Sequence, residues 1–228
     1  MNSPLVVFDL DGTLVDTAPD LVATLNAILA REGLPPVDYA TARNFVGGGT
    51  RLMVERGFLA SGRNLPSATL DDYTRDFIEY YAGHIADSSV PFPGVEAALD
   101  TLAERGCRFA VCTNKVEKLS LMLLDALGLS KRFAAICGAD TFGVIKPDPQ
   151  ILHRTIARAG ATGNGAVMVG DSITDIATAR AANIPVIAVD FGYTDTPVAD
   201  LAPDRIVSRF ADLPTAVYAL LGAPKPQS

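Results

Sequence analysis

Short runs of apolar residues recur along the chain and alternate with segments of helical periodicity. The first run is Leu5–Phe8, and four similar runs follow it further along the sequence. Continuous apolar runs of this length are typical of strands that are buried on both faces of a parallel sheet. The later runs span residues 108–112, 134–137, 166–169 and 185–189.

Helical patterns lie between these predicted strands. Strands that alternate with helices form right-handed βαβ units, which build a doubly wound sheet. We therefore predict an α/β fold with a doubly wound, Rossmann-like parallel sheet as its core. The expected helices span residues 94–104, 116–127, 149–159 and 173–182.

One long segment breaks the alternation of strands and helices. Its pattern is purely helical, with apolar residues at helix spacing in residues 17–31 and again in residues 70–84. The Pro-Phe-Pro-Gly stretch at residues 91–94 then marks the return to the α/β pattern. We read this segment as an all-helical cap domain that is inserted after the first strand. The predicted cap domain comprises residues 16–86, and the predicted core domain comprises residues 1–15 and 87–228.

The composition is that of an acidic globular protein. Lys and Arg total 19, Asp and Glu total 26, the net charge is −7, and 49% of the residues are hydrophobic. An acidic chain without basic runs argues against binding to nucleic acid or to an anionic membrane. The N-terminus lacks a secretory signal pattern, and no apolar stretch approaches the ~20 residues that span a bilayer. Three cysteines without a CxxC pair indicate buried, reduced thiols in a cytoplasmic protein. The tail after Gly222 is expected to be frayed.

The first candidate site residues follow the first predicted strand directly, in the sequence Asp9-Leu10-Asp11-Gly12-Thr13. Ligands of open α/β sheets bind at the carboxyl ends of strands. Because side chains alternate along an extended chain, Asp9 and Asp11 point the same way, and they can divide into a nucleophile and an acid/base. Gly12 permits a sharp turn at the site and is expected to contact the phosphate. Taken alone, the motif also fits an Asx turn without a metal.

Two weaker motifs follow later strands. Thr113-Asn114 ends the 108–112 strand, where a hydroxyl can donate to a phosphate oxygen, although a turn or a helix cap is the simpler interpretation. Lys146-Pro147 opens the helix that begins near residue 149, and its ammonium is a compact charge that suits phosphate. A solvated lysine before a helix-starting proline is the alternative.

The fourth motif is Gly170-Asp171-Ser172-Ile173-Thr174-Asp175, which follows the 166–169 strand. Asp171 ends the strand, and Asp175 lies four residues later on the same face of the expected helix. Acidic residues also favour helix N-termini for purely structural reasons. All four motifs, however, stand just past apolar strands. We therefore expect them to meet at one edge of the sheet.

In this order the four motifs resemble those of the haloacid dehalogenase superfamily, over nearly the whole chain. The predicted cap, inserted between the first two motifs, resembles the helical-cap subclass of that superfamily. Haloacid dehalogenases proper lack the second aspartate of the first motif, so Asp11 favours a phosphatase.

The resemblance implies a reaction through an aspartyl-phosphate. Asp9 would attack phosphorus, and Asp11 would protonate the leaving oxygen and then activate water. Asp9, Asp171 and the backbone carbonyl of Asp11 would bind Mg²⁺, while Asp175 would orient Lys146 or a water on the metal. Thr113 and the backbone of Asn114 would hold the phosphoryl oxygens. Charge supports the metal, because a phosphate dianion beside Asp9 and Asp171 gathers four negative charges, and Mg²⁺ with Lys146 leaves one.

The predicted cap contains a glycine-rich stretch, Phe45-Val46-Gly47-Gly48-Gly49-Thr50-Arg51-Leu52. It contains no phosphate-binding GxxxxGK[ST] pattern, and a flexible turn between helices is one interpretation. It also resembles the cap loop of bacterial phosphoglycolate phosphatases, with Gly48 where that family usually has Asn. The segment 191–197 resembles the same family. The resemblance implies 2-phosphoglycolate as the substrate, with the Gly48 loop and Arg51 at its non-phosphate end. On this basis, replacing Arg51 with alanine is expected to raise KM.

Other functions remain open from the sequence. Another phosphatase of small substrates, such as a sugar phosphate or pyrophosphate, or a phosphomutase would use the same scaffold. A phospho-accepting signalling domain also combines Asp, Mg²⁺, Thr and Lys-Pro, but it is typically shorter and carries its acidic pair differently. The expected partner is a small-molecule phosphate ester, and the protein is expected to be a monomer or a homodimer.

Overall fold

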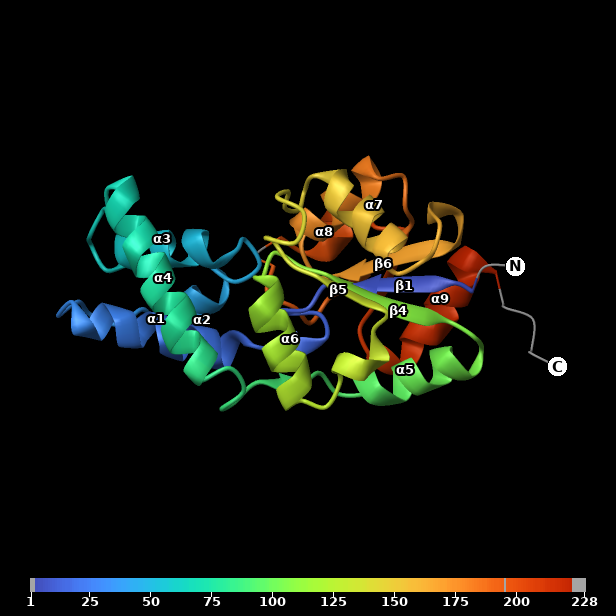
Figure 1. Ribbon diagram of the computed structural model, residues 1–228, viewed down its shortest axis with the longest axis horizontal. Coiled ribbons are helices and arrows are strands. Elements are labelled where there is room, and N and C mark those ends of the chain that lie inside the picture. Colours follow the sequence, from blue (N-terminus) through green and yellow to red (C-terminus); the bar gives the residue numbers. More distant parts are fainter. Residues whose placement is uncertain (1–2, 195, 223–228) are drawn as a thin grey trace.

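The computed structural model describes residues 3–194 and 196–222, so the predicted fraying of the tail lies outside the described residues. At its centre lies a six-stranded sheet in the order β5-β4-β1-β6-β7-β8, and all neighbouring strands are parallel (Figure 1). The predicted doubly wound α/β sheet is therefore confirmed. The strands are β1 (Leu5–Phe8), β4 (Arg108–Cys112), β5 (Ala135–Cys137), β6 (Ala166–Gly170), β7 (Val186–Val189) and β8 (Arg205–Val207).

Helices cover both faces of the sheet, and the alternation of side chains along each strand divides the core in two. Val6 and Phe8 of β1 pack with α5, α6 and α9, whereas Leu5 and Val7 pack with α7 and α8 on the opposite face. Both sets are fully buried, which explains the continuous apolar run in the sequence. The helices are α5 (Val95–Glu104), α6 (Glu117–Ala126), α7 (Pro149–Arg158), α8 (Ile173–Ala181) and α9 (Leu213–Leu221).

The segment between β2 and β3 forms a separate group of helices beside the sheet, which we call the helical unit (Figure 1). It has its own hydrophobic core, in which Leu25, Phe58 and Phe77 are almost fully buried. Leu119 of α6 also belongs to this core, so the helical unit packs on the sheet-bearing part of the molecule. The helices are α1 (Ala18–Arg31), α2 (Tyr39–Arg43), α3 (Thr50–Ala60) and α4 (Ser67–Gly83).

Two short strands join the helical unit to the rest of the chain. β2 (Val15–Asp16) pairs antiparallel with β3 (Val90–Pro91), so the outgoing and returning connections run side by side. Asp20 on α1 fastens the returning connection, because its buried carboxylate accepts hydrogen bonds from the backbone amides of Ser88 and Ser89 and from the Ser89 hydroxyl. The sequence pattern predicted only helix from residue 16 onward, because strands of two residues are too short to show alternation.

The hydrophobic pattern also missed β8 and α9, which complete one edge and one face of the sheet. Cys107, Cys112 and Cys137 are buried and unpaired, as expected for reduced thiols. Within residues 3–194 and 196–222, every helix is too short or too polar to span a bilayer.

Candidate active site

The motifs singled out in the sequence meet at the carboxyl end of the sheet. Asp9 follows β1, Thr113 follows β4 and Asp171 follows β6, and all three are buried. Backbone pairing continues into these positions, since the amide of Asp9 donates to the carbonyl of Val169 and the amide of Thr113 donates to that of Cys137. The side chains are therefore fixed by the ends of three adjacent strands.

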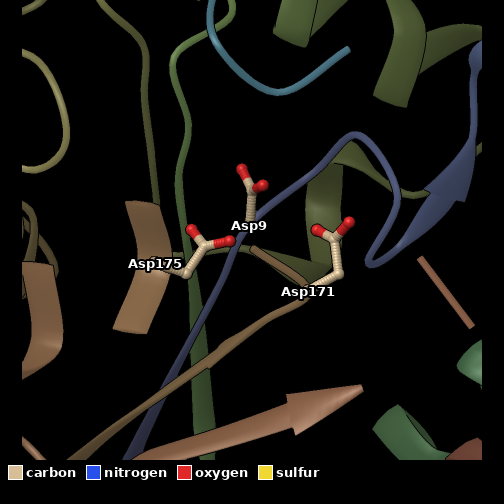
Figure 2. A group of neighbouring side chains, drawn as sticks. All are labelled: Asp9, Asp171 and Asp175. Atoms are coloured by element: carbon tan, nitrogen blue, oxygen red, sulfur yellow. The ribbon is translucent and has the colours of Figure 1, made fainter. Parts of the chain in front are cut away.

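Three carboxylates form the centre of the site (Figure 2). Asp9, Asp171 and Asp175 each offer an oxygen within 4.8 Å of the others, and all three residues are buried. Asp175 comes from the first turn of α8, one helical turn after Asp171. Oxygen donors in this arrangement suit a hard divalent cation.

Lys146 places one positive charge among these carboxylates. Its Nζ lies 2.8 Å from Asp9 Oδ1 and 2.6 Å from Asp175 Oδ1. The side chain of Asn114 positions the lysine, because Nδ2 donates to the Lys146 carbonyl over 3.1 Å and Oδ1 accepts from the Lys146 amide over 2.9 Å. The Lys146–Pro147 peptide bond is cis. Asn114 is thus occupied through its side chain, and only its backbone remains for a ligand.

Both oxygens of Asp175 are engaged. Oδ1 accepts from Lys146, and Oδ2 accepts from the amide of Ser172 over 3.1 Å and from its hydroxyl over 2.6 Å. Ser172 in turn caps α8 by accepting from the Asp175 amide, which completes a capping box. Asp175 therefore anchors Lys146 and the start of α8 at once.

Asp171 is enclosed by two tight backbone turns. Its Oδ1 accepts from the Thr13 hydroxyl over 2.9 Å, and its Oδ2 accepts from the Tyr193 amide over 2.8 Å. A Cβ atom at Gly192 would lie 2.2 Å from Asp171 Cβ, and one at Gly12 would lie 2.5 Å from Oδ2, so both turns require glycine.

Gly12 was predicted to contact the phosphate, and the structure places its amide elsewhere. That amide donates to the carbonyl of Val15 over 3.0 Å, and φ at Gly12 is +83°. The residue forms the turn between β1 and β2 and leaves its N–H no free position for a phosphoryl oxygen. Its role in this structure is to let the backbone pass close to Asp171.

The buried charges of the cluster do not balance. Three carboxylates face one ammonium, so the fully ionised cluster carries two uncompensated negative charges. Burial, and then the charge of Asp175, raise the pKa of Asp9 to about 8, although Lys146 acts in the opposite direction. Burial and Asp175 likewise raise the pKa of Asp171 to about 7. Burial alone would lower the pKa of Lys146, but Asp175 and Asp9 raise it above its usual value, so Lys146 stays charged.

A divalent cation fits this imbalance. Although Lys146 Nζ lies 2.8 Å away, Asp9 Oδ1 accepts no aligned hydrogen bond from any described residue. A buried carboxylate oxygen without a hydrogen bond is costly unless another group satisfies it. An ion with two positive charges would satisfy this oxygen and neutralise the cluster. The residues present therefore fit a hard metal ion.

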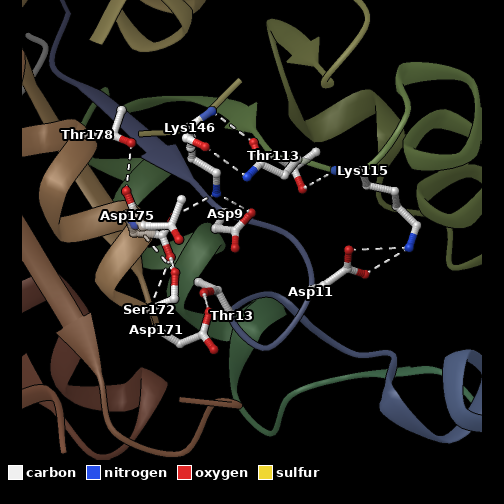
Figure 3. A network of polar contacts seen from close by, with 12 residues as sticks. Asp9, Asp11, Thr13, Thr113, Lys115, Lys146, Asp171, Ser172, Asp175 and Thr178 are labelled. Carbon is white, nitrogen blue, oxygen red and sulfur yellow. Dashed lines mark hydrogen bonds and ion pairs between the residues drawn. The ribbon is translucent and has the colours of Figure 1, made fainter. Parts of the chain in front are cut away.

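Asp11 points away from the three carboxylates and toward Lys115 (Figure 3). Lys115 Nζ lies 2.9 Å from Asp11 Oδ1 and 3.3 Å from Oδ2, and the Thr17 hydroxyl donates to Oδ1 over 2.7 Å. Both members of the ion pair are almost fully buried. Lys115 was not among the predicted site residues, although it directly follows the Thr113-Asn114 motif after β4.

A cavity lies between the helical unit and the carboxyl end of the sheet. Among the described residues that line it, the charged ones all lie on the sheet side, whereas the helical side is mainly apolar. The glycine-rich loop before α3 belongs to the helical side, where Gly49 lies against the Asn114 carbonyl. The sheet side consists of Asp9, Asp11, Thr113, Asn114 and Lys115, and the helical side consists of Leu21, Phe45, Val46, Gly47, Gly49, Thr50, Met53 and Phe77.

Arg51 and Gly48, which were predicted to contact the substrate, do not line this cavity. Arg51 donates to Asp71 Oδ1 over 2.9 Å and to the Ser67 hydroxyl over 3.0 Å, and its side chain is about half exposed. Successive helical residues are about 100° apart, so Thr50 faces the cavity while Arg51 faces α4. Gly48 lies against the side chain of Leu52 instead of the cavity.

Tyr193 connects the Asp171 turn to the helical unit. Its hydroxyl donates to Asp16 over 2.6 Å and accepts from the amide of Ala18 over 3.0 Å. Arg43 of α2 stacks over the Tyr193 ring, with its guanidinium carbon 5.0 Å from the centroid, and donates to the carbonyl of Gly192 over 2.6 Å. Tyr193 belongs to segment 191–197, which resembles phosphoglycolate phosphatases, but the contact with Arg43 could not be predicted from the hydrophobic pattern.

Comparison with known proteins places this geometry in a family. A family model described as haloacid dehalogenase-like hydrolase matches residues 6–189. A phosphoglycolate phosphatase of Mesorhizobium japonicum is 50% identical over 210 residues, which cover 92% of each chain. A phosphoglycolate phosphatase of Agrobacterium fabrum is 47% identical and covers 96% of this chain and 94% of its own. A solved structure from Haemophilus somnus, described as a predicted phosphoglycolate phosphatase, has a TM-score of 0.86 at 30% identity and covers 94% of this chain and 97% of its own.

Proposed function

The chain belongs to the haloacid dehalogenase-like hydrolases, and we propose that it is a Mg²⁺-dependent phosphatase that converts 2-phosphoglycolate to glycolate and phosphate. The observation that carries the proposal is the buried cluster of Asp9, Asp171 and Asp175 around a single lysine. This cluster can accept a cation and a phosphoryl group at once. The substrate is supported by relatives up to 50% identical that are named phosphoglycolate phosphatases.

Asp9 is the proposed nucleophile. One of its oxygens attacks phosphorus, the bond from phosphorus to the ester oxygen breaks, and the phosphoryl group passes to the carboxylate. Burial raises the pKa of Asp9 to about 8 in the metal-free cluster, and added positive charge would lower it toward the ionised, nucleophilic form. Lys146, 2.8 Å away, holds the attacking carboxylate in place and neutralises part of the charge that gathers during attack.

Asp11 is the proposed acid and base. It gives a proton to the leaving ester oxygen, and glycolate departs. The Asp11 carboxylate then takes a proton from water as that water attacks the phosphorus of the aspartyl-phosphate, which releases phosphate and restores Asp9. Thr113 and the backbone of Asn114 hold the phosphoryl oxygens.

Mg²⁺ would be held by Asp9, Asp171 and the backbone carbonyl of Asp11. The carboxylate of Asp175 is less suited to bind the ion directly than that of Asp171, because its Oδ1 faces the Lys146 ammonium at 2.6 Å and its Oδ2 already accepts two hydrogen bonds from Ser172. When bound, the ion would neutralise negative charge on the cluster and on the phosphate. Asp175 would therefore act by orienting Lys146.

The helical unit is proposed to act as a cap domain of residues 16–86 over a core of residues 1–15 and 87–228. It contributes the apolar side of the cavity, including Leu21, Met53 and Phe77. These side chains exclude water from the ester, which strengthens the electrostatic contacts on the sheet side and favours attack by Asp9 over attack by water.

A panel of phosphate esters tests this function. We expect kcat/KM with Mg²⁺ to be highest for 2-phosphoglycolate, ahead of sugar phosphates and pyrophosphate, with free phosphate as the readout. The variant D9N is expected to lose at least about 10⁴-fold in kcat. The matched control is D190N, since Asp190 is an exposed carboxylate at the end of β7 that lies outside the cluster.

The other outcomes of the panel identify the alternatives. Preference for another ester would replace the substrate and keep the mechanism. Transfer of the phosphoryl group to a second position of a sugar phosphate would indicate a phosphomutase. Absence of turnover for every ester would contradict the proposal and favour a phospho-accepting signalling domain.

A further inference from the structure

We propose that Lys115 recognises the carboxylate of the substrate and that this contact frees Asp11 to act as the acid and base. The proposal rests on the proposed function, because it assigns the group that selects a phosphorylated carboxylate at the same site. Lys115 would thus be a residue for specificity, as distinct from Lys146, which faces the phosphate.

Lys115 is the only positively charged side chain among the described residues that line the cavity. Arg51 faces outward and pairs with Asp71. The apolar residues of the helical side, such as Leu21, Met53 and Phe77, cannot stabilise a carboxylate. A substrate whose phosphoryl group lies at Asp9 therefore has one cation available for its other end.

The ammonium of Lys115 lines the cavity and is shielded from bulk solvent. Its side chain is about 4% exposed, and Nζ lies 4.5 Å from the centre of the Tyr81 ring. A desolvated cation beside a ring face and a single carboxylate interacts strongly with a second anion that enters the same space. Such a site favours a substrate with a carboxylate over a neutral one of the same shape.

The two oxygens of Asp11 are held unequally. Oδ1 accepts from Thr17 over 2.7 Å and from Lys115 over 2.9 Å, whereas Oδ2 has only the 3.3 Å contact to Lys115. Oδ2 is therefore the oxygen that Lys115 most easily gives up. When the substrate carboxylate takes that N–H, Oδ1 keeps Asp11 in place through Thr17, and Oδ2 is free to face the ester oxygen.

This exchange links recognition to catalysis. A phosphate ester without a carboxylate leaves Asp11 Oδ2 on Lys115 and lacks the ammonium contact as well. Discrimination should then appear in kcat as well as in KM, because the missing group acts on the proton-transfer step in addition to binding.

The experiment compares 2-phosphoglycolate with ethyl phosphate, in which a methyl group replaces the carboxylate. It uses the full-length protein with Mg²⁺, the variants K115M and K115Q, and K118M as the matched control, because Lys118 is an exposed lysine on α6. We expect wild type and K118M to prefer 2-phosphoglycolate. In K115M the preference should fall on the order of 100-fold, mainly through loss of kcat/KM for 2-phosphoglycolate.

Each other outcome is decisive. An equal loss for both substrates would show that Lys115 only holds Asp11, and it would overturn the inference while the proposed function stands. A wild-type preference that survives in K115M would do the same. Wild type without any preference for 2-phosphoglycolate would overturn the proposed substrate and the inference together. Thermal melting of each variant verifies folding, and K115Q, which keeps an N–H donor for Asp11, replaces K115M if that variant does not fold.

Discussion

On the sheet side of the cavity, the charged groups are held by several contacts from strand ends and neighbouring loops, whereas the helical side offers mainly apolar side chains. Lys146 touches two carboxylates and is fixed by Asn114, and Asp171 is enclosed by Thr13 and Tyr193. The apolar side chains of the helical side line the cavity only when the helical unit is packed against the carboxyl end of the sheet. In this proposal the strand ends hold the chemistry common to all phosphate esters, and selectivity comes from Lys115, which lies between Asp11 on the sheet side and Tyr81 of the helical unit.

After loss of the nucleophile itself in D9N, the largest effect is expected on the sheet side, from K146M. The substitution leaves three buried carboxylates without their cation, and removal of a group that stabilises charge in the transition state costs about 10²–10³-fold in rate. The loss in kcat should be the same for 2-phosphoglycolate and ethyl phosphate, because Lys146 faces the phosphate that both share. Steady-state kinetics of K146M and of K131M, a variant of an exposed lysine, measure it. A loss confined to 2-phosphoglycolate would contradict the assignment of Lys146 to the phosphate and of Lys115 to the substrate carboxylate.

Without the metal, the three carboxylates of the sheet side are only partly neutralised by Lys146. The free energy of unfolding of the metal-free protein should therefore depend on pH. The pKa values of Asp9 and Asp171, about 8 and about 7, lie above their ordinary value of 3.8. The metal-free folded state thus binds more protons than the unfolded state, and the resulting stability is complete below about pH 4 and is lost as the pH rises through 7 to 8. Because Mg²⁺ binds the ionised carboxylates, it should restore stability most at high pH.

Thermal melting in EDTA and in saturating Mg²⁺ at pH 5, 6.5 and 8 measures this effect. We expect Mg²⁺ to raise Tm by roughly 5–10 °C at pH 8 and much less at pH 5. The variant D171N should abolish the difference, whereas D190N should keep it. A Mg²⁺ effect that is equal at all three pH values would contradict the account of the cluster.

A smaller effect is expected at the junction, from R43A. Arg43 stacks on Tyr193 and donates to the Gly192 carbonyl, so its loss should loosen the helical unit without touching the cluster. These contacts are worth about 1–2 kcal/mol, which corresponds to about 5–30-fold. We expect kcat/KM to fall within that range for 2-phosphoglycolate and ethyl phosphate alike, while Mg²⁺ binding by titration calorimetry stays unchanged. A change in Mg²⁺ affinity would show that the two sides of the cavity are not separate.

The smallest effect is expected from R51A. The resemblance of the glycine-rich loop implied a higher KM, but the structure pairs Arg51 with Asp71 on the outside of the helical unit. We now expect a KM within about twofold of wild type and a loss of stability below about 1 kcal/mol, as for other exposed ion pairs. A KM increase of tenfold with 2-phosphoglycolate would mean that Arg51 reaches the cavity after all.

The sequence could predict the sheet side because its residues follow strands, and parallel strands end at one edge. That rule made Asp9, Thr113 and Asp171 candidates, and the resemblance to the superfamily supplied their roles. Lys146 joins them from the loop after β5. The two-residue strands β2 and β3 and the outward direction of Arg51 could not be predicted, because neither changes the hydrophobic pattern. The Arg43–Tyr193 contact joins segments far apart in the chain, which local spacing cannot reveal. Lys115 could have been identified as a candidate from the sequence, because it directly follows the Thr113-Asn114 motif.

The central claim is that the carboxylate of Asp9 takes up the phosphoryl group. Rapid mixing of the Mg²⁺-loaded protein with 2-phosphoglycolate, followed by acid quenching and borohydride reduction, converts an aspartyl-phosphate to an alcohol that peptide mass spectrometry can locate. We predict a reduced side chain at position 9 that appears only with substrate. Reduction at another position, or an unmodified Asp9 during active turnover, would contradict the account.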